Sequence, residues 1–333
     1  MKAVSPETTL PADPSAGDNT GDLSHSRRLG AFRKFYYFLE YALIRLLGGL
    51  LNSLPFAFVL RLARPVGHLL FRFLNKSRER ALSNLRLAYG REIPESEIQQ
   101  IAKGSFRYVV EFGVEWLRLP RIAKNPDRYL ESRTADLIHS ALKQGRGALL
   151  LLSHGGNWEI MALMGGLFLA KPVGATIYAL ARPVRNPYLY DRILALRGLT
   201  GLKSIRKIGA VRETFKRLKE NAIVCTLMDQ RIDEGSVEAD FFGQKALTTS
   251  LPALCALRLG TPVFYVFLRR PRPLRYVLEV EGPAPISETG NFDEDIRTNT
   301  QRFNDRIETE IRKDPARWLW MHHRWRSKHG AKD

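Results

Sequence analysis

Cysteine and acidic residues are both scarce in this sequence. Only Cys225 and Cys255 occur in 333 residues, without CxxC spacing or a neighbouring histidine pair. This argues against a zinc site or a disulfide scaffold and favours a reducing compartment. The 34 acidic residues are outnumbered by 52 basic ones, so the formal net charge is +18. A charge of this size predicts a polyanionic partner surface, for which nucleic acid, anionic lipid and an acidic carrier protein all qualify.

The first 26 residues contain no aromatic side chain and are rich in Pro, Ser, Thr and Asp. Such a composition buries too little apolar surface to order the chain, so it predicts a disordered tail over residues 1–26. These residues also lack the apolar run of a secretory signal, and we expect no export.

Residues 27–80 are basic and aromatic but contain no long apolar run. From Ser26 to Arg80, eleven Lys and Arg residues accompany only two acids, and the longest uncharged run, Leu46 to Leu60, has 15 residues. A membrane-spanning helix needs about 20 largely apolar residues, which argues against a full span. The segment is predicted to anchor the protein through helices lying in the membrane interface, with a buried helix pair as the alternative.

The rest of the chain, residues 81–330, predicts one α/β domain. Apolar runs at 147–153, 173–178, 222–228, 263–268 and 276–280 are typical of strands. Helical patterns lie between them and at both ends, at 96–117, 159–169, 188–197, 211–219, 250–259 and 291–313. The predicted fold is a central mixed, mostly parallel sheet flanked by helices, preceded by the membrane-associated helices.

The segment from Ser153 to Glu159, SHGGNWE, follows the first apolar strand. Ligands of open α/β sheets bind at the carboxyl ends of strands, so His154 is a candidate reactive group. Asn157 is expected to cap the next helix and Glu159 to lie in its first turn. From there Glu159 is predicted to reach the His154 ring and orient it as a general base.

Other interpretations of this segment remain open at this stage. A histidine followed by a glutamate also arises by chance, and a histidine near a helix start needs no catalytic role. The chain has no HExxH pattern, so a metal site is weakly supported. It also has no GxSxG elbow, so we expect direct attack by an acceptor hydroxyl on a bound thioester and no covalent acyl-enzyme.

Several blocks of the sequence resemble the glycerolipid and lipid A acyltransferases. HGGNWE looks like their H-x4-D/E motif in its Glu form, and four further blocks follow in family order. These are YALARPVRNP from Tyr178, with Arg197 closing the next helix; LMDQ, which contains Asp229; ADFFG from Ala239; and WLWMHHRW from Trp318. The resemblance runs from about Phe35 to Arg326.

The resemblance implies a glycerolipid acyltransferase-like fold and an enzyme on the cytoplasmic face of the inner membrane. It would transfer a fatty acyl chain from acyl carrier protein to a hydroxyl of a lipid A precursor, without metal or other cofactor. His154, Glu159, Asp229 and Arg197 are the implied catalytic residues, and Arg182 and Asn157 the implied substrate-binding ones. HGGNWE also suits relatives that acylate phosphatidylinositol mannosides, so the glycolipid acceptor stays open, as does acyl-CoA as the donor.

Two rival functions are weaker. A nucleic-acid-binding protein is supported by charge alone, because the chain contains no RNP, KH, helix-turn-helix or zinc-finger pattern, and no nucleic acid is expected. A non-catalytic protein that binds membranes with the same fold is the other rival. The expected partners are therefore acyl carrier protein, an anionic glycolipid and anionic inner-membrane lipids.

Overall fold

The computed structural model describes residues 30–181, 184–206 and 208–325. Seven strands form a central sheet in the order β1-β9-β8-β2-β5-β3-β4, in which only β8 and β9 pair antiparallel. The predicted mixed, mostly parallel sheet is confirmed. The strands are β1 Leu130–Arg133, β2 Ala148–Leu152, β3 Ile177–Ala181, β4 Leu202–Arg206, β5 Ile223–Leu227, β8 Val263–Arg272 and β9 Arg275–Glu281.

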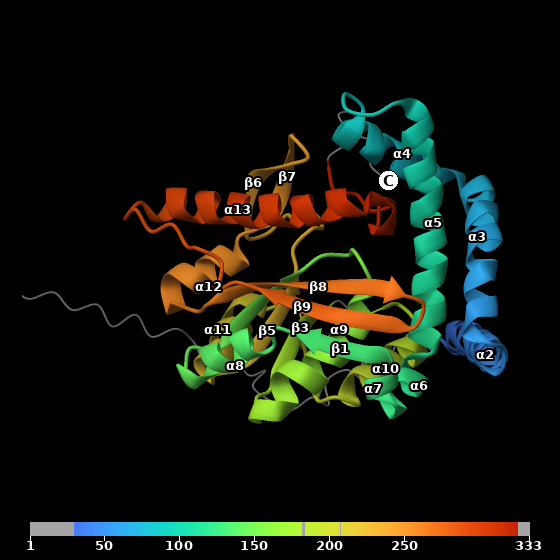
Figure 1. Cartoon of the computed structure of the whole chain (residues 1–333), viewed down its shortest axis with the longest axis horizontal. Coiled ribbons are helices and arrows are strands. Elements are labelled where there is room, and N and C mark those ends of the chain that lie inside the picture. Colours follow the sequence, from blue (N-terminus) through green and yellow to red (C-terminus); the bar gives the residue numbers. More distant parts are fainter. Residues whose placement is uncertain (1–29, 182–183, 207, 326–333) are drawn as a thin grey trace, which may run out of the picture.

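Helices cover both faces of this sheet (Figure 1). A hairpin of β6 Ser236–Phe241 and β7 Gln244–Thr249 lies beside the long helix α13. The helices are α2 Ala31–Ser53, α3 Phe56–Phe73, α4 Asn75–Tyr89, α5 Glu95–Leu117, α6 Leu119–Lys124, α7 Pro126–Tyr129, α8 Asp136–Lys143, α9 Trp158–Met164, α10 Pro187–Gly198, α11 Ala210–Lys219, α12 Leu251–Leu259 and α13 Phe292–Lys313. Short π and 3-10 turns follow α9, at Gly165–Ala170 and Lys171–Val173, and α13, at Pro315–Arg317.

The central strand β2 has an apolar side chain at every position because both of its faces are buried. Leu149 and Leu151 belong to the core shared with α12 and α13, whereas Leu150 and Leu152 belong to the core shared with α8 and α9. This alternation follows from the two-residue period of a strand. The strand therefore ends at Leu152 between two packed layers, which fixes where the next loop leaves the sheet.

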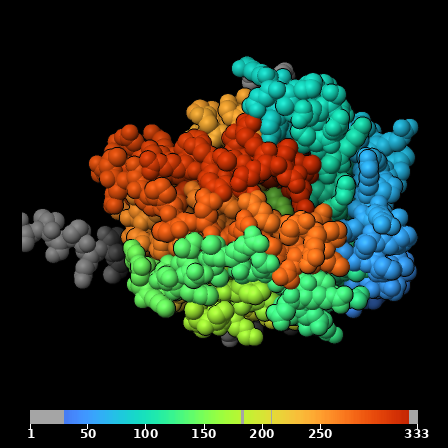
Figure 2. Space-filling view, in the orientation of Figure 1, coloured from blue at the N-terminus to red at the C-terminus, as the bar shows by residue number. Residues whose placement is uncertain are grey.

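The helices α2 and α3 form a layer along one edge of the molecule, outside α5 (Figure 2). At Gly67 a Cβ atom would lie 2.6 Å from the Cα atom of Arg107, so the missing side chain allows α3 to approach α5 closely. Among the described residues, no helix is sufficiently long and apolar to cross a membrane.

Most of the exposed large apolar side chains of the described chain lie on these two helices and at the end of α3. We call this set the apolar patch; its members are Phe32, Phe35, Tyr36, Phe38, Leu39, Leu43, Leu46, Leu47, Leu50, Phe58, Leu62, Val66, Leu69, Phe73 and Leu74.

Candidate active site

The carboxyl ends of β2 and β5 bring His154 and Asp229 together. The two strands are parallel neighbours in register from Ala148 and Ile223 onward, so the residues that follow them lie side by side. His154 Nδ1 is 2.7 Å from Asp229 Oδ1, and the backbone N–H of His154 donates to Asp229 Oδ2 at 2.6 Å. The carboxylate therefore holds both the ring and the backbone of the histidine.

The carboxylate of Asp229 is fully buried and has a third donor. The indole Nε1–H of Trp318 donates to Oδ2 at 2.6 Å. Burial by itself would raise the pKa of this carboxyl group, but the charge of His154 and the hydrogen bonds from His154 and Trp318 hold the pKa below its usual range. The ionised carboxylate is therefore both buried and paired within the site.

The second ring nitrogen of His154 faces Gln230. With Nδ1–H donated to Asp229, Nε2 carries the lone pair, and Gln230 Nε2 lies 2.9 Å away in position to donate to it. The histidine side chain is 12% exposed. This tautomer is the one in which Nε2 accepts a proton from a hydroxyl that takes the place of the Gln230 amide.

The loop around the histidine is fixed by close packing. Gly156 has a φ of 75° and a Cβ there would lie 3.3 Å from Leu268 Cβ, so the turn requires glycine. The buried Tyr108 hydroxyl donates to the carbonyl oxygen of Gly156, and the Trp158 ring meets the His154 ring edge-on at 5.0 Å. The imidazole is therefore preorganised before any substrate arrives.

Glu159 does not orient His154, and this prediction is wrong. Its carboxylate forms a two-pronged ion pair with Arg197, with Oε2 3.0 Å from Nε and Oε1 2.6 Å from Nη2. Glu159 lies in the first turn of α9 and Arg197 in the last turn of α10, so the pair ties these two helices together beside the loop. Asp229, from the neighbouring strand, reaches Nδ1 instead.

Asn157 caps α9 as predicted, since its Oδ1 accepts from the backbone N–H groups of Glu159 and Ile160. Its Nδ2 donates to Glu115 at 2.9 Å and the residue is 0% exposed, so it has no surface for the predicted contact with substrate. Glu115 also accepts from Arg270, which bonds Glu111 as well. This buried network fixes the loop to α5 and β8. Arg182, the other predicted substrate-binding residue, lies outside the described residues.

Two contributors to the site have no role in the sequence-based predictions. Trp318 comes 89 residues after Asp229, within an aromatic block whose tryptophans are buried, and Gln230 is part of the LMDQ block. Only that block signals Gln230, because it directly follows the aspartate. Within the described residues, no group of three or more His, Cys, Asp or Glu is arranged to hold a metal ion.

Known acyltransferases resemble this chain over most of its length. The profile of the bacterial lipid A biosynthesis acyltransferases matches residues 27–327. The chain is 26% identical over 258 residues to a phosphatidylinositol mannoside acyltransferase of Mycolicibacterium smegmatis, covering 75% of this chain and 80% of that protein. It is 28% identical over 226 residues to the protein of the same name from Mycobacterium tuberculosis strain H37Rv, covering 63% of this chain and 66% of that protein. The family match spans nearly the whole chain, and the protein is therefore an acyltransferase that belongs to the bacterial lipid A biosynthesis acyltransferase family.

Proposed function

We propose that the protein transfers a fatty acyl chain from a thioester to a sugar hydroxyl of an anionic glycolipid, with His154 as the general base. The observation that carries the proposal is the His154–Asp229 pair, in which a buried carboxylate holds Nδ1 and leaves Nε2 as the acceptor. A base and its orienting group are the parts that hydroxyl activation needs.

The reaction takes place in two linked proton transfers. The acceptor hydroxyl displaces the Gln230 amide from Nε2, and His154 removes its proton as the oxygen attacks the thioester carbonyl carbon. The carbon–sulfur bond then breaks, and the imidazolium returns the proton to the departing thiolate. Asp229 stabilises the imidazolium in between, and Glu159 with Arg197 positions the loop by tying α9 to α10.

The acceptor we put first is a phosphatidylinositol mannoside, because the relatives from both mycobacterial species carry that activity in their names. A lipid A precursor is the second candidate, favoured by the description of the family. Both are phosphate-bearing glycolipids. The net charge of +18 suits such acceptors and an acidic acyl carrier protein as donor, with acyl-CoA as the alternative thioester.

The proposed location is the cytoplasmic face of the inner membrane. The apolar patch concentrates exposed large apolar side chains on two consecutive helices, as surfaces that meet a partner or a membrane do, and Arg33, Arg61 and Arg64 lie exposed among its residues. Apolar side chains with interspersed cations suit helices that lie in the interface of an anionic bilayer.

The test is an acyl-transfer assay with purified protein in detergent. Acyl carrier protein thioester and acyl-CoA are each supplied with a phosphatidylinositol mannoside or a Kdo-bearing lipid A precursor, and acceptors are followed by mass spectrometry. A gain of one acyl group on one acceptor is expected. His154→Ala and Asp229→Asn should each lower the rate by roughly 10²–10⁴-fold, because the base is lost or held in the wrong tautomer. Unchanged transfer in folded His154→Ala would refute the mechanism.

A further inference from the structure

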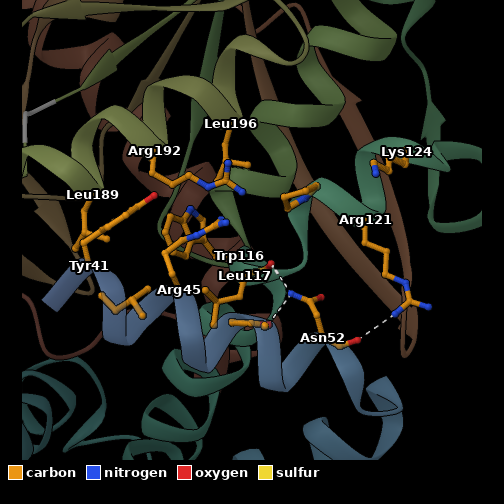
Figure 3. Close-up of a pocket in the computed structure, with 14 residues that line it drawn as sticks. Tyr41, Arg45, Asn52, Trp116, Leu117, Arg121, Lys124, Leu189, Arg192 and Leu196 are labelled. Atoms are coloured by element: carbon orange, nitrogen blue, oxygen red, sulfur yellow. Dashed lines mark hydrogen bonds between the residues drawn. The ribbon is translucent and has the colours of Figure 1, made fainter. Parts of the chain in front are cut away.

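A cavity of about 400 Å³ lies between α2, α10 and the junction of α5 and α6, outside the active-site loop (Figure 3). Its walls are tied together on two sides. Asn186, the cap of α10, donates to Glu40 of α2 at 3.0 Å, and Asn52 of α2 donates to the Leu117 carbonyl of α5 at 3.1 Å. The volume is within the range of small-ligand sites.

The lining is cationic and contains no acidic side chain. Arg45 comes from α2, Arg192 from α10, and Arg121 and Lys124 from α6. Among the hydrogen bonds and ion pairs of the described residues, none involves the side chain of Arg45, Lys124 or Arg192. This separates them from arginines of the α/β body such as Arg197 and Arg270, which have carboxylate partners.

The arrangement of these cations favours an anion between them. Figure 3 shows Arg45 and Arg192 reaching toward the same part of the cavity, next to Trp116. Like charges held near each other repel, and an oxyanion bound between them replaces this repulsion with attraction. Each guanidinium can also donate two parallel hydrogen bonds to the oxyanion. The C-terminal end of α2 carries the partial negative charge of its unpaired carbonyl groups. Arg118 and Arg121 already bind there, since they donate to the carbonyl oxygens of Leu54 and Asn52.

The remaining lining is apolar and borders the apolar patch. Ile44, Trp116, Leu117, Leu189 and Leu196 contribute to the walls. Leu43, Leu46 and Leu47, next to the cavity residues of α2, are exposed members of the patch. A ligand with an anionic head and an apolar body fits both surfaces together.

We propose that this cavity binds the phosphate head group of an anionic phospholipid while the acyl chains of that lipid lie along the apolar patch. Arg45 and Arg192 bind the phosphate, and Lys124 supplies further positive charge. The site is separate from the chemistry at His154 and would anchor the protein on one lipid molecule.

The test is calorimetric titration of the full chain in nonionic detergent with dihexanoyl phosphatidylglycerol. Saturable binding of one lipid per protein is expected. Arg45→Ala with Arg192→Ala should weaken binding about tenfold or more, since charge-assisted hydrogen bonds to phosphate are lost. Both side chains lack partners, so the double variant is expected to fold, and Arg45→Lys with Arg192→Lys should recover part of the affinity.

The matched control is Arg33→Ala with Arg61→Ala, which removes two exposed charges from α2 and α3 outside the cavity. It should bind the lipid like the unmodified protein; an equal loss in both double variants would overturn the proposal in favour of diffuse attraction. Inorganic phosphate should bind far more weakly, and equal affinity would overturn the assignment to a lipid. His154→Ala should bind normally, so failure of this proposal and failure of the proposed reaction are distinguishable.

Discussion

The indole of Trp318 donates to Asp229, which in turn holds the imidazole, so at the scale of single residues Trp318 acts as a positioning group. Trp318→Phe keeps a ring in the core but removes the N–H donor. Losing one charge-assisted hydrogen bond, worth about 1.5–3 kcal/mol, should lower kcat roughly tenfold or more while KM changes little. Steady-state kinetics with the acceptor found in the transfer assay would check this.

A pH profile separates positioning from mere loss of packing. The pKa of Asp229 is lowered in the fold, so its ionised carboxylate stabilises the folded site above the unfolded pKa. This stabilisation is lost as pH falls through the folded pKa. Without the indole donor that pKa rises, and the acidic limb of the rate profile should move to higher pH. If the rate of Trp318→Phe is lower at every pH but the acidic limb of its profile does not move, Trp318 is a packing residue only.

Gln230 allows a test of the base itself. In Gln230→Glu a carboxylate would face Nε2 and hold a proton on it, so less of the free base is present at neutral pH. Activity at pH 7 should fall and recover in part as pH rises. Gln230→Ala, which removes the amide without adding charge, should show no such recovery; matching pH profiles in the two variants would contradict the assignment of Nε2 as base.

Sequence reasoning located His154 and Asp229 but paired the histidine with the wrong carboxylate. Glu159 is five residues from His154, and a local pattern favours the near partner. Asp229 is 75 residues away, and only the adjacency of β2 and β5 in the sheet brings it to Nδ1. Trp318 is more distant still. Pairings of this kind depend on strand order, which periodicity does not encode.

Among secondary-structure elements, continuous apolar runs were predicted best. The runs at 147–153 and 222–228 became β2 and β5 because both faces of these strands are buried. The expected strand at 173–178 begins instead at Ile177, since a 3-10 turn occupies Lys171–Val173. The strand β4 and the hairpin of β6 and β7 were not predicted, because their half-buried residues mix polar and apolar types.

The docking of α3 on α5 is testable with Gly67 of α3 and, as a control, Gly49 of α2. Gly67→Ala puts a Cβ against the backbone of Arg107 and should destabilise the fold by about 1–3 kcal/mol. Gly49 has no atom within 4 Å of such a Cβ, so Gly49→Ala should stabilise by about 0.5–1 kcal/mol through helix propensity. Chemical unfolding of both variants would check the opposite signs, and a stabilised Gly67→Ala would disprove the close approach.

Charge and apolar surface are distributed unevenly over the whole molecule. The three tryptophans of the block from Trp318 to Trp325 are buried, and Arg324 of the same block is only 1% exposed. Burial lowers the pKa of that arginine to about 10. The C-terminal tryptophans are therefore in the core, and the apolar surface available to a bilayer is concentrated on α2 and α3.

This distribution predicts that membrane binding depends on the apolar patch. Leu46 and Leu50, 74% and 59% exposed, lie one turn apart on α2. Leu46→Asp with Leu50→Asp should leave stability nearly unchanged but lower binding to vesicles of phosphatidylglycerol and phosphatidylcholine at least about tenfold, since each buried leucine contributes about 1.5–3 kcal/mol. Leu199→Asp with Val211→Asp adds the same charge at exposed positions outside the patch and should bind normally. Equal release of both variants would mean that net charge, and not the apolar patch, holds the protein on the membrane.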